Sequence, residues 1–87
     1  MTLTIGYKPT FLRDFKKLPA ELQADAKDKI ELFKNTDNYK KLKVHKLKGK
    51  LKTYYSFSIS YSHRVVFEYQ NKQTVTFLAV GDHDVYR

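Results

Sequence analysis

The clearest pattern in this chain is the stretch Tyr55-Ser56-Phe57-Ser58-Ile59-Ser60-Tyr61-Ser62, in which large apolar residues alternate strictly with serines. A period of two residues is typical of a β-strand, because successive side chains of a strand point to opposite faces of its sheet. One face of this strand is therefore apolar and the other is small and polar. We expect the rest of the protein to cover the apolar face and to leave the serine face open to solvent.

The segments around this stretch also predict strands. Residues 64–69 alternate in the same way and bring Arg64 into phase with the serines. Residues 71–72 are a plausible tight turn, and residues 74–80 predict the next strand. Residues 2–7 alternate as well, so a strand is expected at the start of the chain. The pattern favours a small, mostly antiparallel, twisted sheet of about four strands.

Between the first strand and the others, the apolar period changes to that of a helix. A short helix is predicted from Phe11, Phe15 and Leu18, which are spaced i, i+4 and i+7. Pro19 can open a second helix, because proline is tolerated in the first turn, and the apolar stripe of that helix is Leu22, Ala26, Ile30 and Phe33. We therefore expect an α+β fold in the order β-α-α-β-β-β, with a two-helix hairpin packed on one face of the sheet.

Size and composition restrict the class of protein. A chain of 87 residues is expected to form one domain, residues 1–87. There is no cysteine, so no disulfide can stabilise the fold. The N-terminus does not read as a signal peptide, and no apolar run approaches the roughly 20 residues that a membrane span needs. We expect a cytoplasmic protein with no membrane association.

The charge is high and uneven. The formal net charge is +8, and fourteen of the seventeen Lys and Arg residues lie at or before Lys52. Residues 40–52 hold seven lysines and no acid. Clustered lysines favour a polyanionic partner such as nucleic acid or an acidic protein segment. The alternative is a solvated face that only keeps the protein soluble.

The last residues of the chain bring several reactive groups together. Residues 81–87 follow the final predicted strand and contain an imidazole, two carboxylates, a phenol and a guanidinium. Histidine suits proton transfer at neutral pH, and arginine suits binding of phosphate. A small basic protein with this ending is suited to act on a phosphate backbone. Three potential ligands within one short loop are a weak metal signal, so we expect neither a metal nor another cofactor.

Three landmarks together resemble the RelE/ParE superfamily of bacterial toxins from type II toxin–antitoxin modules. They are the turn Leu47-Lys48-Gly49, the strand His63-Arg64-Val65-Val66-Phe67 and the terminal run Gly81-Asp82-His83-Asp84-Val85-Tyr86. The resemblance covers nearly the whole chain. A histidine before the first landmark, His45, is similar to the YafQ branch of that superfamily.

This resemblance implies a fold and a choice of functions. The RelE and YafQ branches cut mRNA in the ribosomal A site, which predicts a ribosome-dependent endoribonuclease (mRNA interferase) that binds mRNA and rRNA. The ParE branch instead poisons DNA gyrase on the same fold, so a gyrase inhibitor is the alternative. A non-catalytic RNA-binding domain is a third interpretation. In each toxin interpretation, a cognate acidic antitoxin would neutralise the protein in a hetero-oligomer.

The resemblance also suggests roles for individual residues. His83 and His45 are the candidates for proton transfer, Arg64 for binding the phosphate, and Tyr86 for stacking on a base or hydrogen-bonding the phosphate. Their alternatives are structural: a solvated His45, an Arg64 paired with an acid, and a Tyr86 ring that pins the C-terminus in the core. The residues expected to contact RNA are Lys46, Lys48, Lys50, Lys52, His63 and Arg87.

The chain departs from the pattern of these relatives at three positions. Active members often carry arginines on the strand where this chain has Ser56 and Ser58, and YafQ-like members carry one where it has Ala79. Some phosphate-stabilising charge is therefore missing, or it is supplied by Arg87 or by the lysines.

Overall fold

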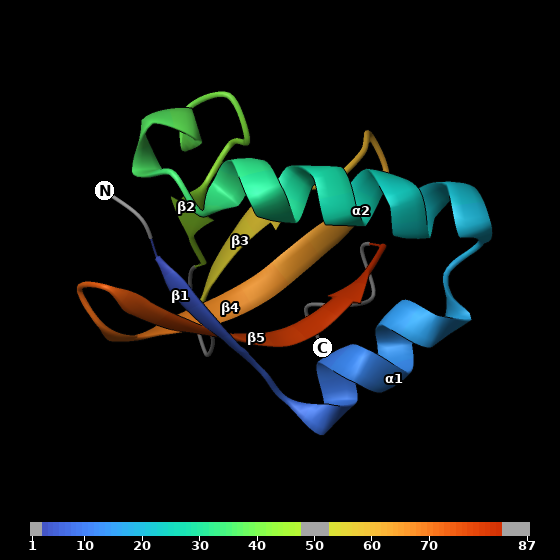
Figure 1. The fold of residues 1–87 in the computed structure, drawn as a ribbon, viewed down its shortest axis with the longest axis horizontal. Coiled ribbons are helices and arrows are strands. Elements are labelled where there is room, and N and C mark those ends of the chain that lie inside the picture. Colours follow the sequence, from blue (N-terminus) through green and yellow to red (C-terminus); the bar gives the residue numbers. More distant parts are fainter. Residues whose placement is uncertain (1–2, 48–52, 83–87) are drawn as a thin grey trace.

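The described part of the chain forms one mixed sheet with two helices against it (Figure 1). The computed structural model describes residues 3–47 and 53–82. Its elements are β1 (Thr4–Tyr7), α1 (Pro9–Lys17), α2 (Ala20–Phe33), the 3₁₀ helix η1 (Thr36–Asn38), β2 (His45–Lys46), β3 (Tyr55–Ser58), β4 (Arg64–Asn71) and β5 (Thr74–Gly81).

The strand order places the first and the last strand of the chain side by side. The order across the sheet is β1-β5-β4-β3-β2, with β1 parallel to β5 and the other pairs antiparallel. The α+β class and the predicted order are confirmed. The sequence predicted about four strands, and the structure adds a fifth because two residues of the basic tract, His45 and Lys46, pair with the edge of β3.

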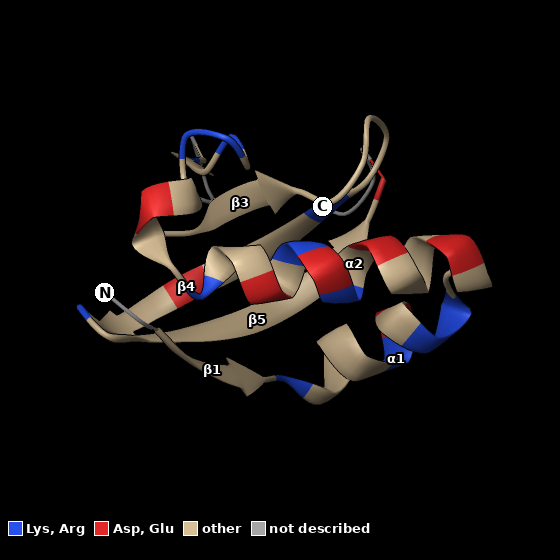
Figure 2. Ribbon diagram, turned by 45° about the horizontal axis from the view of Figure 1, so that its top comes forward, with Lys and Arg blue, Asp and Glu red and all other residues tan. Residues whose placement is uncertain are grey.

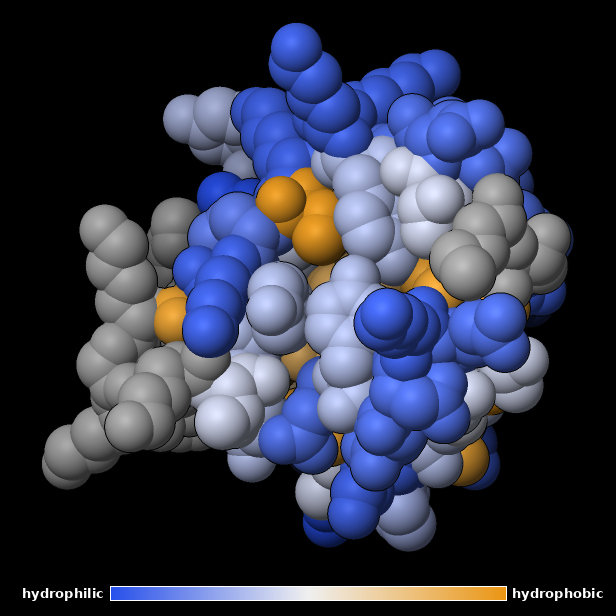
Figure 3. Space-filling model, turned by 90° about the vertical axis from the view of Figure 1, so that its left-hand side faces the viewer, coloured by the Kyte–Doolittle hydropathy of each residue, from blue (hydrophilic) through white to orange (hydrophobic). Residues whose placement is uncertain are grey.

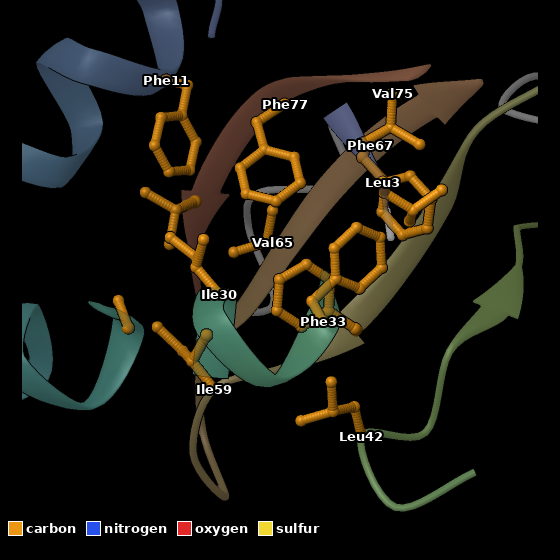
Figure 4. Packing of buried hydrophobic residues seen from close by; sticks show 13 residues of the cluster. Leu3, Phe11, Ile30, Phe33, Leu42, Ile59, Val65, Phe67, Val75 and Phe77 are labelled. Carbon is orange, nitrogen blue, oxygen red and sulfur yellow. The ribbon is translucent and has the colours of Figure 1, made fainter. Parts of the chain in front are cut away.

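The core lies between the sheet and α2, which crosses the apolar face of the strands (Figures 1 and 4). Phe33, in the last turn of α2, is fully buried at its centre. Its ring stacks on Phe57 at a centroid distance of 4.4 Å and meets Phe67 edge-on at 4.8 Å. Such aromatic pairs add to the free energy gained from burial alone. The rings thus compensate for the small number of aliphatic residues in a short chain.

A side-chain hydrogen bond links α1 to strand β5. Between Val66 and Phe67 the pairing of β4 with β5 shifts, so Leu78 has no directly opposite residue. Thr10 in the first turn of α1 donates a hydrogen bond to the Leu78 carbonyl at 2.7 Å. This bond uses a backbone acceptor at an irregularity of the sheet.

The serine-rich segment differs from its prediction in two ways. The backbone N–H groups of Ile59 and Ser60 donate to the His63 carbonyl, so β3 ends at Ser58 and the chain turns. Tyr61, expected on the apolar face, is 100% exposed as a result.

The expectation of an open serine face is wrong at its centre. Ser56 is 0% exposed. It lies in an interior row of the sheet, between His45 on β2 and Val66 on β4, and Val66 is itself buried. Ser58 is only half-buried, so this face is closed in the middle and more open toward the end of β3.

None of the helices within residues 3–47 and 53–82 is both long enough and apolar enough to cross a membrane.

Candidate functional site

His45 lies at the edge of the sheet, where β2 pairs with β3. Its side chain is exposed, and its cross-strand neighbour is Ser56. Directly opposite residues in a β pair project to the same face, so the imidazole lies on the serine face. Ser56 Oγ is 3.4 Å from His45 Nε2.

A backbone carbonyl determines the orientation of this imidazole. His45 Nδ1 lies 2.9 Å from the Lys43 carbonyl oxygen. Because a carbonyl can only accept a hydrogen bond, Nδ1 carries the proton and donates it. In the neutral ring Nε2 is then the unprotonated nitrogen, which can accept a hydrogen bond from the Ser56 hydroxyl. The arrangement therefore presents a proton acceptor toward the serine face.

Lys43 has the backbone conformation that makes this contact possible. Its φ is 59°, in the left-handed region that residues with a side chain rarely adopt. Hydrogen bonds from Lys43 N to the Lys40 carbonyl and from Val44 N to the Tyr39 carbonyl hold the turn. Backbone strain of this kind, about 1–3 kcal/mol, persists only where the surroundings enforce it.

Arg64 begins β4 on the same face, one row away. It donates a hydrogen bond from Nη1 to Ser58 Oγ at 2.5 Å, and Ser58 is also its cross-strand neighbour. On its other side it pairs with Gly81 of β5. Within the described part of the chain, no carboxylate lies at ion-pair distance from its guanidinium. The guanidinium is therefore held in place by a neutral hydroxyl, and no acid of the described residues neutralises it.

The register of the sheet sets the distance between these two groups. His45 is opposite Ser56, and Arg64 is opposite Ser58, so they lie on either side of β3 and two residues apart along it. With strands about 4.8 Å apart and a rise of about 3.4 Å per residue, their Cα atoms are about 12 Å apart. Both side chains are long enough to contact a single phosphodiester placed between them.

Two other predicted contacts lie at the edges of this area. His63 is in the β3–β4 loop, where its Nδ1 is 2.7 Å from Ser62 Oγ. Lys46 is exposed on β2, but its cross-strand neighbour is Tyr55, which belongs to the apolar face. Lys46 therefore lies at the sheet edge and points away from the His45 side.

Six predicted site residues fall outside the described residues. They are His83, Tyr86 and Arg87 near the C-terminus, and Lys48, Lys50 and Lys52 before β3. Their predicted roles stay predictions. Within residues 3–47 and 53–82, no group of three or more His, Asp or Glu side chains gathers to hold a metal ion.

The charge of the described surface agrees with a polyanionic ligand. Lysines of the turn before β2 gather beside β3, whereas α2 carries both signs (Figure 2). The face shown in Figure 3 is mostly hydrophilic, and its apolar residues appear only as small separate areas.

Comparison with known proteins identifies the family. Residues 5–85 match the family described as the ParE toxin of type II toxin–antitoxin systems, parDE. The chain belongs to this toxin family. The predicted RelE/ParE resemblance is confirmed.

Solved structures of other toxins share the fold of this toxin. It is similar to the YoeB dimer from Staphylococcus aureus, with 28% identity, a TM-score of 0.68 and coverage of 95% of this chain and 99% of that chain. The RelB–RelE antitoxin–toxin complex from Methanococcus jannaschii gives 26% identity, a TM-score of 0.71 and coverage of 91% of each chain. The DinJ–YafQ complex from E. coli gives 19% identity, a TM-score of 0.72 and coverage of 97% of this chain and 96% of that chain. Among curated proteins, no sequence matches this toxin significantly.

The sequence did not reveal the two atoms that contact the His45 imidazole, the Lys43 carbonyl oxygen and Ser56 Oγ. Ser56 was noted only as a departure from the superfamily pattern, and the role of the Lys43 carbonyl was missed. A backbone acceptor has no signature in a side-chain pattern, and Lys43 offers no cue to its left-handed φ. The only available signal was the period that places Ser56 on the same face as Arg64.

Proposed function

We propose that this toxin is a ribosome-dependent mRNA endoribonuclease that needs no metal ion. The observation that supports the proposal is the orientation of His45, whose Nδ1–H is fixed by the Lys43 carbonyl so that Nε2 is an acceptor on the face that carries Arg64. A histidine at a sheet edge that served only solubility would not need its tautomer fixed.

The reaction follows from these groups. His45 Nε2 removes the proton of the ribose 2′-hydroxyl, whose oxygen attacks the adjacent phosphorus. The bond from phosphorus to the 5′-oxygen breaks, and a general acid returns a proton to that oxygen. The products are a 2′,3′-cyclic phosphate and a 5′-hydroxyl end. Arg64 stabilises the extra negative charge on the phosphoryl oxygens, and its planar fork suits that task.

His83 is the proposed acid. In the sequence it comes two residues after Gly81, the β5 residue that pairs with Arg64. In this proposal Tyr86 stacks on a base or binds the phosphate. Lys46, Lys48, Lys50, Lys52, His63 and Arg87 hold the RNA or rRNA backbone through charge and hydrogen bonds.

Inhibition of DNA gyrase is the second candidate function. It is favoured by the family match, which is to ParE toxins. It is also favoured by Ser56 and Ser58, neutral residues where the resemblance leads us to expect arginines. On this interpretation the described face is a docking surface without chemistry.

In both cases the proposed partner is an acidic antitoxin encoded beside the toxin. RelE from Methanococcus jannaschii and YafQ from E. coli are each seen in a complex with their antitoxins. A net charge of +8 suits an acidic partner that covers the basic surface.

A reconstituted translation reaction tests the proposal. We expect the toxin to generate new mRNA 5′ ends within translated codons, and His83→Ala to abolish them while still binding the antitoxin. Intact mRNA at saturating toxin, together with loss of supercoiling by purified gyrase, would replace the nuclease with the second candidate. A fully active His83→Ala variant would show that His83 is not the acid.

A further inference from the structure

A pocket of about 360 Å³ lies beside the proposed site, between α2, the turn before β2 and the β3–β4 loop. Four cationic side chains line it, and they come from three separate places in the fold: Lys29 on α2, Lys41 and Lys43 in the turn, and Arg64 at the start of β4. Only Arg64 was singled out from the sequence. The other three converge because α2 and the turn both pack beside β3.

The remaining lining of the pocket suits an anion that also accepts hydrogen bonds. Ser58 and Ser60 also line the pocket, and the buried residues Leu42 and Ile59 contribute apolar surface. Within residues 3–47 and 53–82, no carboxylate lines the pocket. The four cations repel one another, and a bound anion relieves that repulsion.

Tyr61 gives the pocket a second kind of contact. Its side chain lines the pocket and is 100% exposed, the most exposed large apolar group among the described residues. The turn that ends β3 at Ser58 is what moves this ring out of the core. Proteins often bind single-stranded RNA with an exposed aromatic ring next to cations. A base stacks on the ring, and its phosphate contacts the positive charges.

We propose that this pocket binds a nucleotide of single-stranded RNA that flanks the scissile linkage, with its phosphate among Lys29, Lys41 and Lys43 and its base on Tyr61. The inference rests on the proposed nuclease function, because only a nuclease has a scissile linkage beside which this nucleotide would lie. Arg64 connects the two sites, because it lines the pocket and also lies on the face of His45. An acidic peptide would satisfy the cations, but every nucleotide of RNA carries both a phosphate for the cations and a base for Tyr61, so the chemistry favours RNA.

Binding of an uncleavable RNA tests the pocket separately from catalysis. The probe is a fluorescent oligouridylate in which every 2′-hydroxyl is replaced by fluorine, and its affinity is measured by anisotropy over a range of salt concentrations. In the Lys29→Gln/Lys41→Gln variant we expect a weaker salt dependence. The magnitude of the slope of log affinity against log salt should decrease by about 0.7 for each lysine that contacts a phosphate. For Tyr61→Ala we expect an affinity loss of roughly 5- to 100-fold.

The matched control is Lys16→Gln/Lys17→Gln, which removes the same charge from the exposed last turn of α1. Equal salt slopes for the two double variants, with thermal unfolding of each at the wild-type temperature, would overturn the proposal. So would a pocket variant that loses affinity for an oligoglutamate peptide but binds the oligouridylate normally. A toxin that binds the probe through the pocket but leaves translated mRNA intact would contradict the proposed function alone.

Discussion

Ser56 Oγ lies 3.4 Å from His45 Nε2 across the β2–β3 pair, and Ser56 is fully buried although it lies on the polar face of its strand. A small neutral residue fits this position, because a long charged one would lose its hydration there. The serine that departs from the superfamily pattern is therefore a structural requirement of this sheet and a neighbour of the candidate base.

Replacing Ser56 with lysine should therefore destabilise the fold. We expect Ser56→Lys to lower the free energy of unfolding by about 3 kcal/mol or more, because burial at this position would take the ammonium out of water. Urea unfolding followed by circular dichroism measures the change. The control is Ser58→Lys, at a half-buried position on the same strand and face, which should cost less. Equal losses for the two variants would contradict this account of Ser56.

Removing the imidazole of His45 should affect catalysis and leave the fold intact. The side chain is exposed, so His45→Ala should unfold at nearly the wild-type urea concentration. If Nε2 is the general base, the rate of mRNA cleavage in single-turnover reactions should fall by about 10²- to 10⁴-fold. His63→Ala removes the same group from the β3–β4 loop and should weaken RNA binding only. Wild-type cleavage by His45→Ala would remove His45 from the mechanism.

The elements with a long, regular period could be predicted from the sequence, and the short or irregular ones could not. Strands β4 and β5 and both helices follow their apolar spacing, because each has one side to bury in the core. Strand β2 has only two residues, too few for a period to exist. The alternation of residues 59–62 continues past the end of β3, because only the hydrogen bonds to the His63 carbonyl decide where the strand stops.

The sequence predicted which residues share a face of the sheet, but not the orientation of His45 or the presence of the pocket. The phase of the alternation placed Arg64 and the serines on one face, which the register confirms. The orientation of His45 depends on a backbone carbonyl, and the pocket depends on how α2 approaches the turn of residues 41–43. The first is a local contact within an irregular turn, and the second is a tertiary relationship between segments distant in sequence, so neither has a periodic signature.

Phe33 should be among the most sensitive positions in the core. Its ring contacts four other aromatic rings, those of Tyr39, Phe57, Phe67 and Phe77. We expect Phe33→Ala to lower the free energy of unfolding by about 3–5 kcal/mol, because it removes buried surface and leaves a cavity. Leu12→Ala, at a residue that is 47% exposed, should change it by less than about 1 kcal/mol. Phe33→Leu keeps part of the volume and provides a measurable intermediate if Phe33→Ala does not fold.

The junction of the two helices depends on one side-chain amide. Gln23 Nε2 donates to the carbonyls of Phe15 and Leu18 at 3.2 and 3.0 Å, at the end of α1, where the Phe15 carbonyl also accepts the backbone N–H of Leu18. Gln23→Ala should lower the free energy of unfolding by about 1–2 kcal/mol in urea titrations. Gln70→Ala removes an exposed amide on β4 and is the control. A Gln23→Ala variant as stable as the control would show that water replaces the amide at no cost.

The tyrosine pair at the edge of the core should make the fold sensitive to alkali. Burial, and then the hydrogen bond between the Tyr39 and Tyr69 hydroxyls at 3.2 Å, raise the pKa of Tyr39 well above its ordinary value of 10.0. Below that ordinary value Tyr39 is protonated in both the folded and the unfolded chain, so its contribution to stability is constant. As the pH rises past it, the unfolded chain loses the proton while the folded chain keeps it, and the free energy of unfolding falls. Tyr39→Phe should flatten this fall in urea titrations between about pH 9 and about pH 12, whereas Tyr61→Phe, which removes the hydroxyl of an exposed ring, should not. The same steep decline in both variants would mean that the pair does not control the alkaline transition.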